Sequence, residues 1–234
     1  MTASAVSSSH SFPFDFSPRT VQDTELLQQL QFVPGLKELL TVRQVHALEH
    51  ATVWVLSELG RSPLASSSAQ ASSAPSTSAP STEQLGGMST ERGFYLYGAV
   101  DPVTVEWAVH RALQRLVAGE WDLAVHPRCG TNVSVGILLT AGLAIGVNWL
   151  LPKDPLGQLL GLGLAATAAA GLAPDFGSLA QRYLTTAIPF NLAVQGVTAS
   201  RDRLGHPVHF VQVQWVESVA VKSVVTTAAP HAYA

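Results

Sequence analysis

The chain is poor in charged residues and almost free of cysteine. Asp, Glu, Lys and Arg together make up 12% of its 234 residues, about half of what a soluble domain usually carries. Its single cysteine allows no disulfide within the chain, which fits reducing surroundings. With a net charge of −3 and no basic patch, the sequence predicts no nucleic-acid partner. The N-terminus also lacks a basic start and a long apolar core, so we expect no cleaved secretory signal.

What the chain does have is two long uncharged runs. No Asp, Glu, Lys or Arg lies between Cys129 and Pro152, and residues 133–151 reach the length of about 20 apolar residues that a bilayer core requires. After a short break of sequence PKDP, residues 156–173 are uncharged again, although richer in Gly and Ala. This pattern predicts an integral membrane protein with two spans, in which a tight loop makes the two helices an antiparallel hairpin.

A buried helical hairpin in a soluble protein is the competing interpretation. Two adjacent runs of spanning length are hard to bury in so small a chain, so the lipid bilayer is the partner we expect. The loop between the runs carries one basic residue, Lys153, while arginines flank the pair on both sides: Arg111, Arg115, Arg128, Arg182, Arg201 and Arg203. By the positive-inside rule, both termini are expected in the cytoplasm.

The rest of the sequence predicts a small module of mixed structure. The fold class we expect is a mainly α membrane protein, a two-helix transmembrane hairpin with a small α+β cytoplasmic module. Helices are predicted at 25–32, from 36 or 41 to 59 with Gly60 as the stop, and at 102–118. Strands are predicted at 92–98, 121–125, 192–200 and 208–216, the last two joined by a turn.

The chain is divided by a low-complexity tract of Ser, Ala and Pro, which cannot bury enough apolar surface to become ordered. Seven segments follow from this reading: a disordered N-terminus (1–19), a helical segment (20–60), a flexible linker (61–88), a small α+β segment (89–132), the transmembrane hairpin (133–173), a C-terminal cytoplasmic helix and strands (174–222), and a tail (223–234).

Two motifs carry the residue types of a metal site. The sequence HALEH at residues 46–50 lies in a predicted helix, where positions i, i+3 and i+4 share one face. His46 and His50 can therefore hold one divalent metal ion, with Glu49 beside them as a ligand or a base. The spacing H-x-x-E-H is typical of one class of zinc enzymes.

The second motif, HPRCGT at residues 126–131, places an imidazole and a thiol three residues apart in a Pro- and Gly-shaped turn. It lies immediately before the first uncharged run. Together, His46, His50, His126 and Cys129 offer more ligands than the three that a catalytic zinc site needs. We therefore predict a divalent metal, zinc in the first instance, as the cofactor and Glu49 as the catalytic base.

At these residues the chain resembles known families. HALEHAT at 46–52 and HPRCGTN at 126–132 resemble the paired motifs of YqhQ-like bacterial membrane proteins, which implies a metal-dependent membrane enzyme. The stretch 40–186 resembles more closely an uncharacterised cyanobacterial membrane family, a domain of unknown function. Leu48 and Ala51 depart from the wider pattern, as does the Ser/Pro-rich insertion between the motifs. The resemblance implies a metal site at the motif residues, but no reaction.

Plainer interpretations stay open. His46 and His50 are also compatible with polar positions on a half-buried helix, Glu49 with an ion pair to Arg43 or Arg128, and Cys129 with an inert thiol. Three hypotheses follow: a zinc-type membrane hydrolase such as a peptidase, with its metal site at the cytoplasmic membrane face; a non-enzymatic membrane protein with a closed structural metal site; and a thiol-based sensor that uses Cys129.

Overall fold

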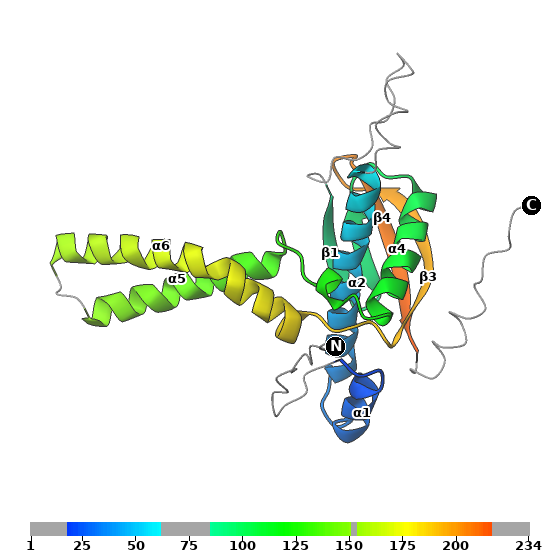
Figure 1. The fold of residues 1–234 in the computed structure, drawn as a ribbon, viewed down its shortest axis with the longest axis horizontal. Coiled ribbons are helices and arrows are strands. Elements are labelled where there is room, and N and C mark those ends of the chain that lie inside the picture. Colours follow the sequence, from blue (N-terminus) through cyan, green and yellow to red (C-terminus); the bar gives the residue numbers. More distant parts are fainter. Residues whose placement is uncertain (1–17, 62–84, 151–153, 217–234) are drawn as a thin grey trace, which may run out of the picture.

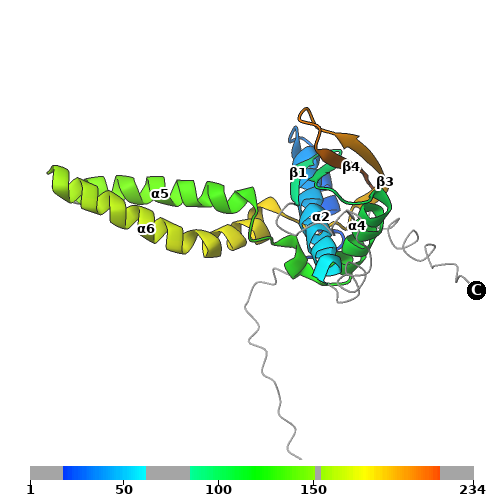
Figure 2. The same ribbon diagram turned by 90° about the horizontal axis from the view of Figure 1, so that it is seen from above.

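A computed structural model describes residues 18–61, 85–150 and 154–216. The fold is mainly helical with one small sheet of four antiparallel strands in the order β1-β2-β4-β3. Helices α2 and α4 cover one face of the sheet, and a long hairpin of α5 and α6 projects from this head (Figures 1 and 2). Most of the predicted disordered N-terminus, most of the predicted linker and the predicted tail lie outside the described residues.

The first two helices differ slightly from their predicted bounds. Helix α1 spans Gln22–Gln29 and α2 spans Leu36–Arg61. Gly60 does not end α2 as predicted, because it keeps a right-handed backbone instead of the positive φ of a helix-terminating glycine. Glycine inside a helix costs only about 1 kcal/mol relative to alanine, which the extensive burial of α2 offsets.

The sheet begins with a hairpin that the sequence predicts only in part. β1 spans Gly86–Thr90, β2 spans Gly93–Tyr97, and they pair in an antiparallel register. The prediction covered β2, whereas β1 starts inside the segment expected to be linker. The strand predicted at 121–125 is wrong, since this stretch forms the 3-10 turn η2, Trp121–Ala124. β2 pairs with β1 and β4 instead. The run 121–125 has only five residues, too few for its alternation to distinguish a strand from a turn.

The remaining strands and α4 confirm the predictions. β3 spans Leu192–Arg201 and β4 spans Pro207–Trp215, paired with a bulge between Val194 and Gly196. α4 spans Pro102–Val117. Asp101 caps its first turn by accepting from the Thr104 amide, and Pro102 occupies the first turn, where its missing N–H costs nothing.

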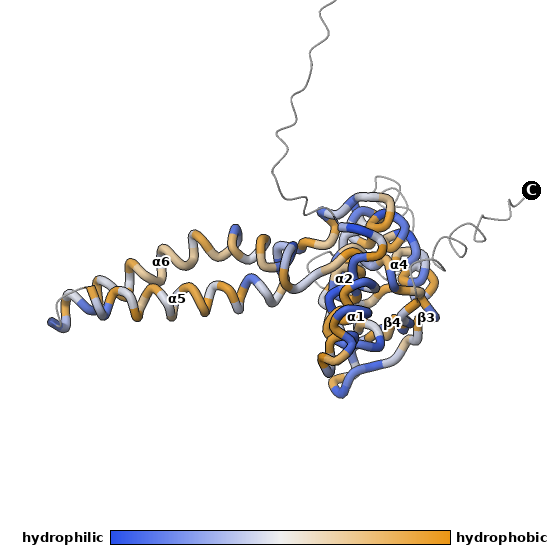
Figure 3. Tube along the Cα trace, turned by 90° about the horizontal axis from the view of Figure 1, so that it is seen from below, coloured by the Kyte–Doolittle hydropathy of each residue, from blue (hydrophilic) through white to orange (hydrophobic). Residues whose placement is uncertain are grey.

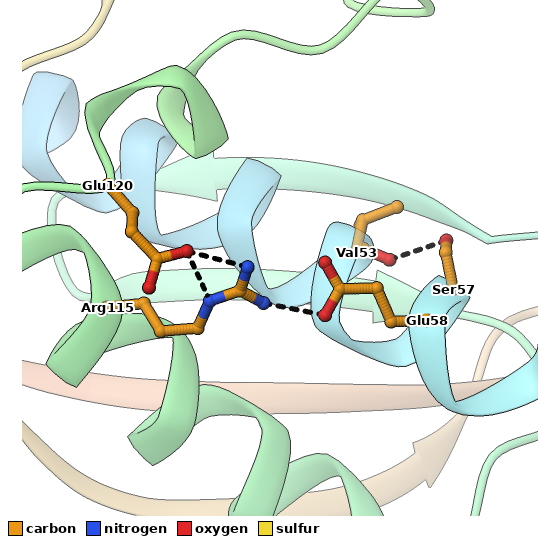
Figure 4. Close-up of polar contacts among 5 residues, drawn as sticks. All are labelled: Val53, Ser57, Glu58, Arg115 and Glu120. Carbon is orange, nitrogen blue, oxygen red and sulfur yellow. Dashed lines mark hydrogen bonds and ion pairs between the residues drawn. The ribbon is translucent and has the colours of Figure 1, made fainter. Parts of the chain in front are cut away.

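The hydrophobic core lies between the sheet and the two helices. One face of the sheet contributes Phe94, Leu96 and Val211, all fully buried, and α2 and α4 contribute stripes of Val, Leu and Ala against it. At the margin of this core, Arg115 of α4 binds Glu58 of α2 and Glu120 just beyond α4 (Figure 4). The packing of α2 within this head fixes the orientation of its histidines.

The hairpin has the opposite character. α5 spans Gly130–Leu150 and α6 spans Pro155–Ala180, continued by one π-helical turn, η3, at Gln181–Thr185. By length and composition, both helices are long and apolar enough to cross a membrane. Apolar residues follow both helices along most of their length (Figure 3). Every residue of α5 is at least partly exposed, and α6 buries only small residues, Gly161, Ala165, Ala169 and Gly177.

Candidate metal centre

Helix α2 presents the first group of candidate ligands. The i, i+3, i+4 spacing of His46, Glu49 and His50 puts them on one side of the helix, and all three line one cleft. Glu49 is 7% exposed and His50 4% exposed, so both are polar groups in the interior. A buried polar group without a hydrogen-bond partner costs free energy. The partners of Glu49 and His50 therefore indicate which chemistry this side of α2 supports.

The second group comes from the turn between η2 and α5. The Cys129 amide donates to the His126 carbonyl oxygen at 3.2 Å, which closes the turn. Buried Gln181 of η3 holds the turn from outside: its Oε1 accepts from the His126 amide at 2.8 Å, and its Nε2 donates to Asn132 at 2.7 Å. The turn is therefore fixed by a residue 55 positions beyond His126, and no motif marked Gln181 in advance.

The two motifs meet in space. Cys129 Sγ lies 3.3 Å from His46 Nε2. One ligand atom each from His46, His50 and Cys129 lies within 4.8 Å of the others. In a tetrahedral zinc site with bonds of about 2.0–2.3 Å, neighbouring ligand atoms are roughly 3.5 Å apart. The Cys129–His46 pair has this spacing, whereas 4.8 Å is the limit for the three atoms together.

Hydrogen bonds to backbone carbonyls orient both imidazoles. His46 Nδ1 lies 3.0 Å from the Thr185 carbonyl oxygen, and His50 Nδ1 lies 2.7 Å from the Ala124 carbonyl oxygen. A carbonyl oxygen only accepts, so Nδ1 carries the proton in each ring and Nε2 is left with its lone pair when the ring is neutral. Metal-bound histidines are held in this way by an acceptor at the other ring nitrogen.

The cluster also favours ionisation of Cys129. Burial raises the pKa of the thiol, but hydrogen bonds from His46, His50 and Thr131 outweigh burial and lower the pKa to about 5. Burial likewise opposes the charged form of His46, but the hydrogen bond and charge of Cys129 keep its pKa above the ordinary value. A thiolate is the form of cysteine that binds metals and acts as a nucleophile.

His126 lies beside this cluster and not within it. Its ring centroid is 5.8 Å from that of His50 and 5.2 Å from that of Trp54. Its Nδ1 accepts from the Arg128 amide at 3.3 Å. Burial, followed by the charges of His50 and Arg128, lowers its pKa to about 4, so His126 is a neutral neighbour. The structure thus brings together three of the four predicted ligands, with the fourth one ring away.

Glu49 has a partner that the sequence did not indicate. Its Oε2 accepts from Ser89 of β1 at 2.6 Å. The adjacent Gly87 packs so closely that a β-carbon there would lie 2.0 Å from Glu49 Oε1. Arg43, one of the two ion-pair partners considered, instead donates to the carbonyl oxygens of Tyr183 and Thr186. Ser89 and Gly87 lie in a stretch expected to be linker or its border, which is why sequence reasoning missed them.

All of these groups open into one cleft of about 310 Å³. Its walls are α2, strand β1 and the turn at 126–130, so that both motifs and the Glu49–Ser89 pair share one space. Polar groups that converge in a cleft and have shifted pKa values mark a candidate active or binding site.

Comparisons with known proteins identify relatives but no activity. The DUF6391 family, described as a domain of unknown function, matches residues 41–197, a stretch that contains both motifs. An uncharacterised protein of Picosynechococcus sp. is 52% identical over 213 residues, which cover 89% of this chain and 98% of that protein. No solved structure matches. An uncharacterised cyanobacterial family is thereby confirmed, while the resemblance to YqhQ-like proteins stays a prediction.

Proposed function

We propose a function for this chain, which belongs to the DUF6391 family: a metal-dependent hydrolase anchored in a membrane by its α5–α6 hairpin. The observation that carries the proposal is the convergence of His46, His50 and Cys129, whose ligand atoms lie within 4.8 Å of one another in a cleft that also contains Glu49. Neither motif alone brings three ligands to one point.

The three ligands suit a zinc ion. Imidazole nitrogen and thiolate sulfur are both zinc ligands, and three protein ligands leave a fourth position open, as at catalytic zinc sites. The carbonyl oxygens of Thr185 and Ala124 accept hydrogen bonds from Nδ1 of the two imidazoles, which leaves Nε2 of each neutral ring available to the ion. His46, His50 and Cys129 would hold the ion through Nε2, Nε2 and Sγ.

Glu49 is the proposed general base. A zinc ion in such a site supplies a water molecule whose pKa is lowered toward 7. Glu49 lies in the same cleft, and Ser89 fixes its carboxylate by donating to Oε2. A carboxylate in this position can accept the proton of an attacking water and return it to the leaving group, a role that contributes about 10²–10⁴-fold to a rate.

The α5–α6 hairpin is proposed as the membrane anchor. Large apolar residues such as Leu138, Leu164 and Trp149 are 71–87% exposed along it, more apolar surface than a soluble protein normally shows to water. Lipid would cover this surface. Arginines on both flanks favour a cytoplasmic location for the head and both termini. The cleft lies beside the start of the hairpin, since Gly130 of α5 belongs to its lining.

A second candidate function rests on the 3.3 Å contact of Cys129 with His46. Without a metal, the raised pKa of His46 and the lowered pKa of Cys129 favour an imidazolium–thiolate pair, the arrangement of a reactive cysteine in a redox sensor or a nucleophile. A closed structural metal site is the third candidate, and it requires a fourth protein ligand beside the cluster.

Metal analysis of the full-length protein in detergent separates these candidates. The wild type is expected to retain about one zinc per chain, His50→Ala to lose most of it, and Glu49→Gln to keep it. His110→Ala removes an exposed histidine of α4 and serves as the matched control with unchanged metal content. Cobalt substitution then reports through its visible spectrum whether Cys129 is bound and whether a position is open to added anions.

A wild-type protein that binds no metal under these conditions would end the hydrolase proposal and leave the imidazolium–thiolate pair. A spectrum insensitive to anions would instead favour the closed structural site. Equal metal loss in His50→Ala and His110→Ala would show that the metal is not held by the cluster.

A further inference from the structure

Strand β1 forms one edge of the sheet. In the order β1-β2-β4-β3, it pairs with β2 on one side, and no other strand of the described chain pairs with its outer side. Successive residues of a strand alternate in the direction of their amide hydrogen bonds, so an edge strand offers unpaired N–H and C=O groups along its length. Such an edge is a template for another extended chain.

This edge borders the candidate metal centre. Residues 86–89 of β1 line the same cleft as His46, His50 and Cys129. Ser89 donates to Glu49 at 2.6 Å, so the strand and the proposed base are in direct contact. A chain laid along β1 would pass within reach of the carboxylate that the proposed function uses.

The composition of β1 suits the approach of a second backbone. It begins with Gly86 and Gly87, and a β-carbon at Gly86 would meet no atom within 4 Å. Met88 is 50% exposed. Glycine in a strand often marks a place where a ligand or another backbone comes close, and this strand has two in succession next to a polar cleft.

The opposite edge of the sheet provides the contrast. Strand β3 also ends the sheet, but none of its residues lines the cleft, and a bulge between Val194 and Gly196 interrupts its register. Bulges are one of the devices that make an edge unsuitable for pairing. Of the two edges in the described sheet, the regular one is the edge at the site.

We propose that the substrate is a polypeptide in extended conformation, which adds to the outer edge of β1 as a further strand. The inference rests on the proposed function and names its substrate class. Water would add its oxygen to the carbonyl carbon of the peptide bond, and the C–N bond would break. Glu49 would take the proton from the water and deliver it to the leaving nitrogen, giving a new carboxyl and a new amino terminus.

A peptide fits this cleft better than a lipid ester does. Backbone groups along an edge strand give affinity through regularly spaced hydrogen bonds, as in other cases of strand addition. An acyl chain has no hydrogen-bond donors or acceptors that could pair with the backbone groups of β1. The expected recognition is therefore of main chain, with selectivity for segments that are not already folded.

Photo-crosslinking tests the location of binding. The probe is β-casein, an unfolded protein, and the protein is the full-length Glu49→Gln variant in detergent, chosen so that bound probe is not cut. Benzoyl-phenylalanine is placed at Met88 in one sample and at Gln195 of β3, an exposed position at the bulge, in the matched control. We expect at least several-fold more cross-linked casein from position 88.

A backbone-methylation series tests the mode of binding. Short synthetic peptides from the cross-linked casein region are N-methylated at one amide at a time. Strand addition predicts losses at every second position, each roughly 2–10-fold in affinity, because only alternate amides bond to the edge.

The outcomes separate the two proposals. Cross-linking at position 88 with a period of two, but no cleavage by the wild type, would uphold peptide binding and end the hydrolase proposal. Cleavage with losses of affinity that lack this period, or equal cross-linking at 88 and 195, would overturn strand addition while hydrolysis stands. Ester hydrolysis in phosphatidylcholine vesicles, with casein left unbound, would overturn the peptide as substrate.

Discussion

The head buries most of its apolar side chains, whereas the hairpin exposes them. In the head, α4 buries a stripe of Val, Ala and Leu against the sheet and α2, and turns its polar residues outward. In the hairpin, α5 has an apolar surface on all sides, and its residues stay at least partly exposed. Two helices of one chain thus require different surroundings, because an amphipathic helix is complete beside a core, whereas an all-round apolar helix is complete only in lipid or deep inside a larger protein.

The two regions meet at the candidate metal centre. The Thr185 carbonyl oxygen, at the end of η3, holds the His46 ring, and Arg43 of α2 binds two further carbonyl oxygens of the same segment. On the other side, Cys129 immediately precedes α5. Because the ends of the hairpin supply or orient the ligands, the site is part of the junction and does not belong to the head alone.

The largest difference we expect between the regions is in their response to pH. In the metal-free protein, Cys129 should ionise with a midpoint near pH 5, where an ordinary thiol ionises near 9. The lowered pKa stabilises the folded head; this contribution is fully present above the ordinary thiol value of about 9 and is lost as pH falls from there through about 5. The raised pKa of His46 acts in the other direction, since its contribution is lost as pH rises through that pKa.

Ultraviolet absorbance of the thiolate, measured against pH, gives this midpoint directly, with Cys129→Ser as the blank. A midpoint close to 9 would show that His46 and His50 do not act on the thiol. The helicity of a peptide of residues 130–185, which contains the hairpin alone, should not change over the same pH range. This result would show that the response to pH belongs to the head.

A charge in the hairpin should affect anchoring and leave the head intact. Leu138→Arg places a guanidinium near the middle of α5 at a position 72% exposed, at a cost of about 3 kcal/mol for insertion into a bilayer. We expect less protein in the membrane fraction after alkaline extraction, with the metal content per folded chain unchanged. Val103→Arg in α4, at a position 73% exposed, is the matched control. Equal extraction of both variants would contradict the membrane anchor.

A methyl group added at Gly87 in the head should displace Glu49, the proposed base. Gly87→Ala would bring its β-carbon to 2.0 Å from Glu49 Oε1, so that Glu49 or β1 must shift, at a cost of about 1–3 kcal/mol. We expect a lower denaturant midpoint and reduced cleavage of β-casein, with metal retained. Gly86→Ala should leave the denaturant midpoint unchanged, because its β-carbon enters open space. Equal effects of the two substitutions would show that the contact with Glu49 is not the cause.

The smallest effect is expected at the surface of the head. Glu58→Gln weakens the ion pair with Arg115, a contact of 2.6 Å at a side chain half exposed to water. Such pairs contribute about 0.2–1 kcal/mol. Chemical denaturation should detect a loss in this range that shrinks at high salt, while Glu106→Gln, at an exposed position on α4, should have no effect. A loss independent of salt would indicate a packing effect instead.

Local patterns predicted most of the elements. The helix that carries HALEH, the helix begun by Asp101 and Pro102, the β3–β4 hairpin and the two apolar helices all follow from spacing and composition that neighbouring residues carry. The errors fall where this signal is weak: β1 has four small or polar residues among its five, and the short run at 121–125 has no long alternation to identify it.

The sequence by itself determined that His46, Glu49 and His50 share one side of a helix, because helical geometry is local. It also determined that two segments are long and apolar enough to cross a membrane, because length and composition decide this. Only the tertiary structure decided that Cys129 lies beside His46, 83 residues away, that His126 stands outside the ligand cluster, and that the edge of β1 borders the cleft. These contacts arise from packing between distant segments, which depends on the whole core and leaves no periodic trace along the chain.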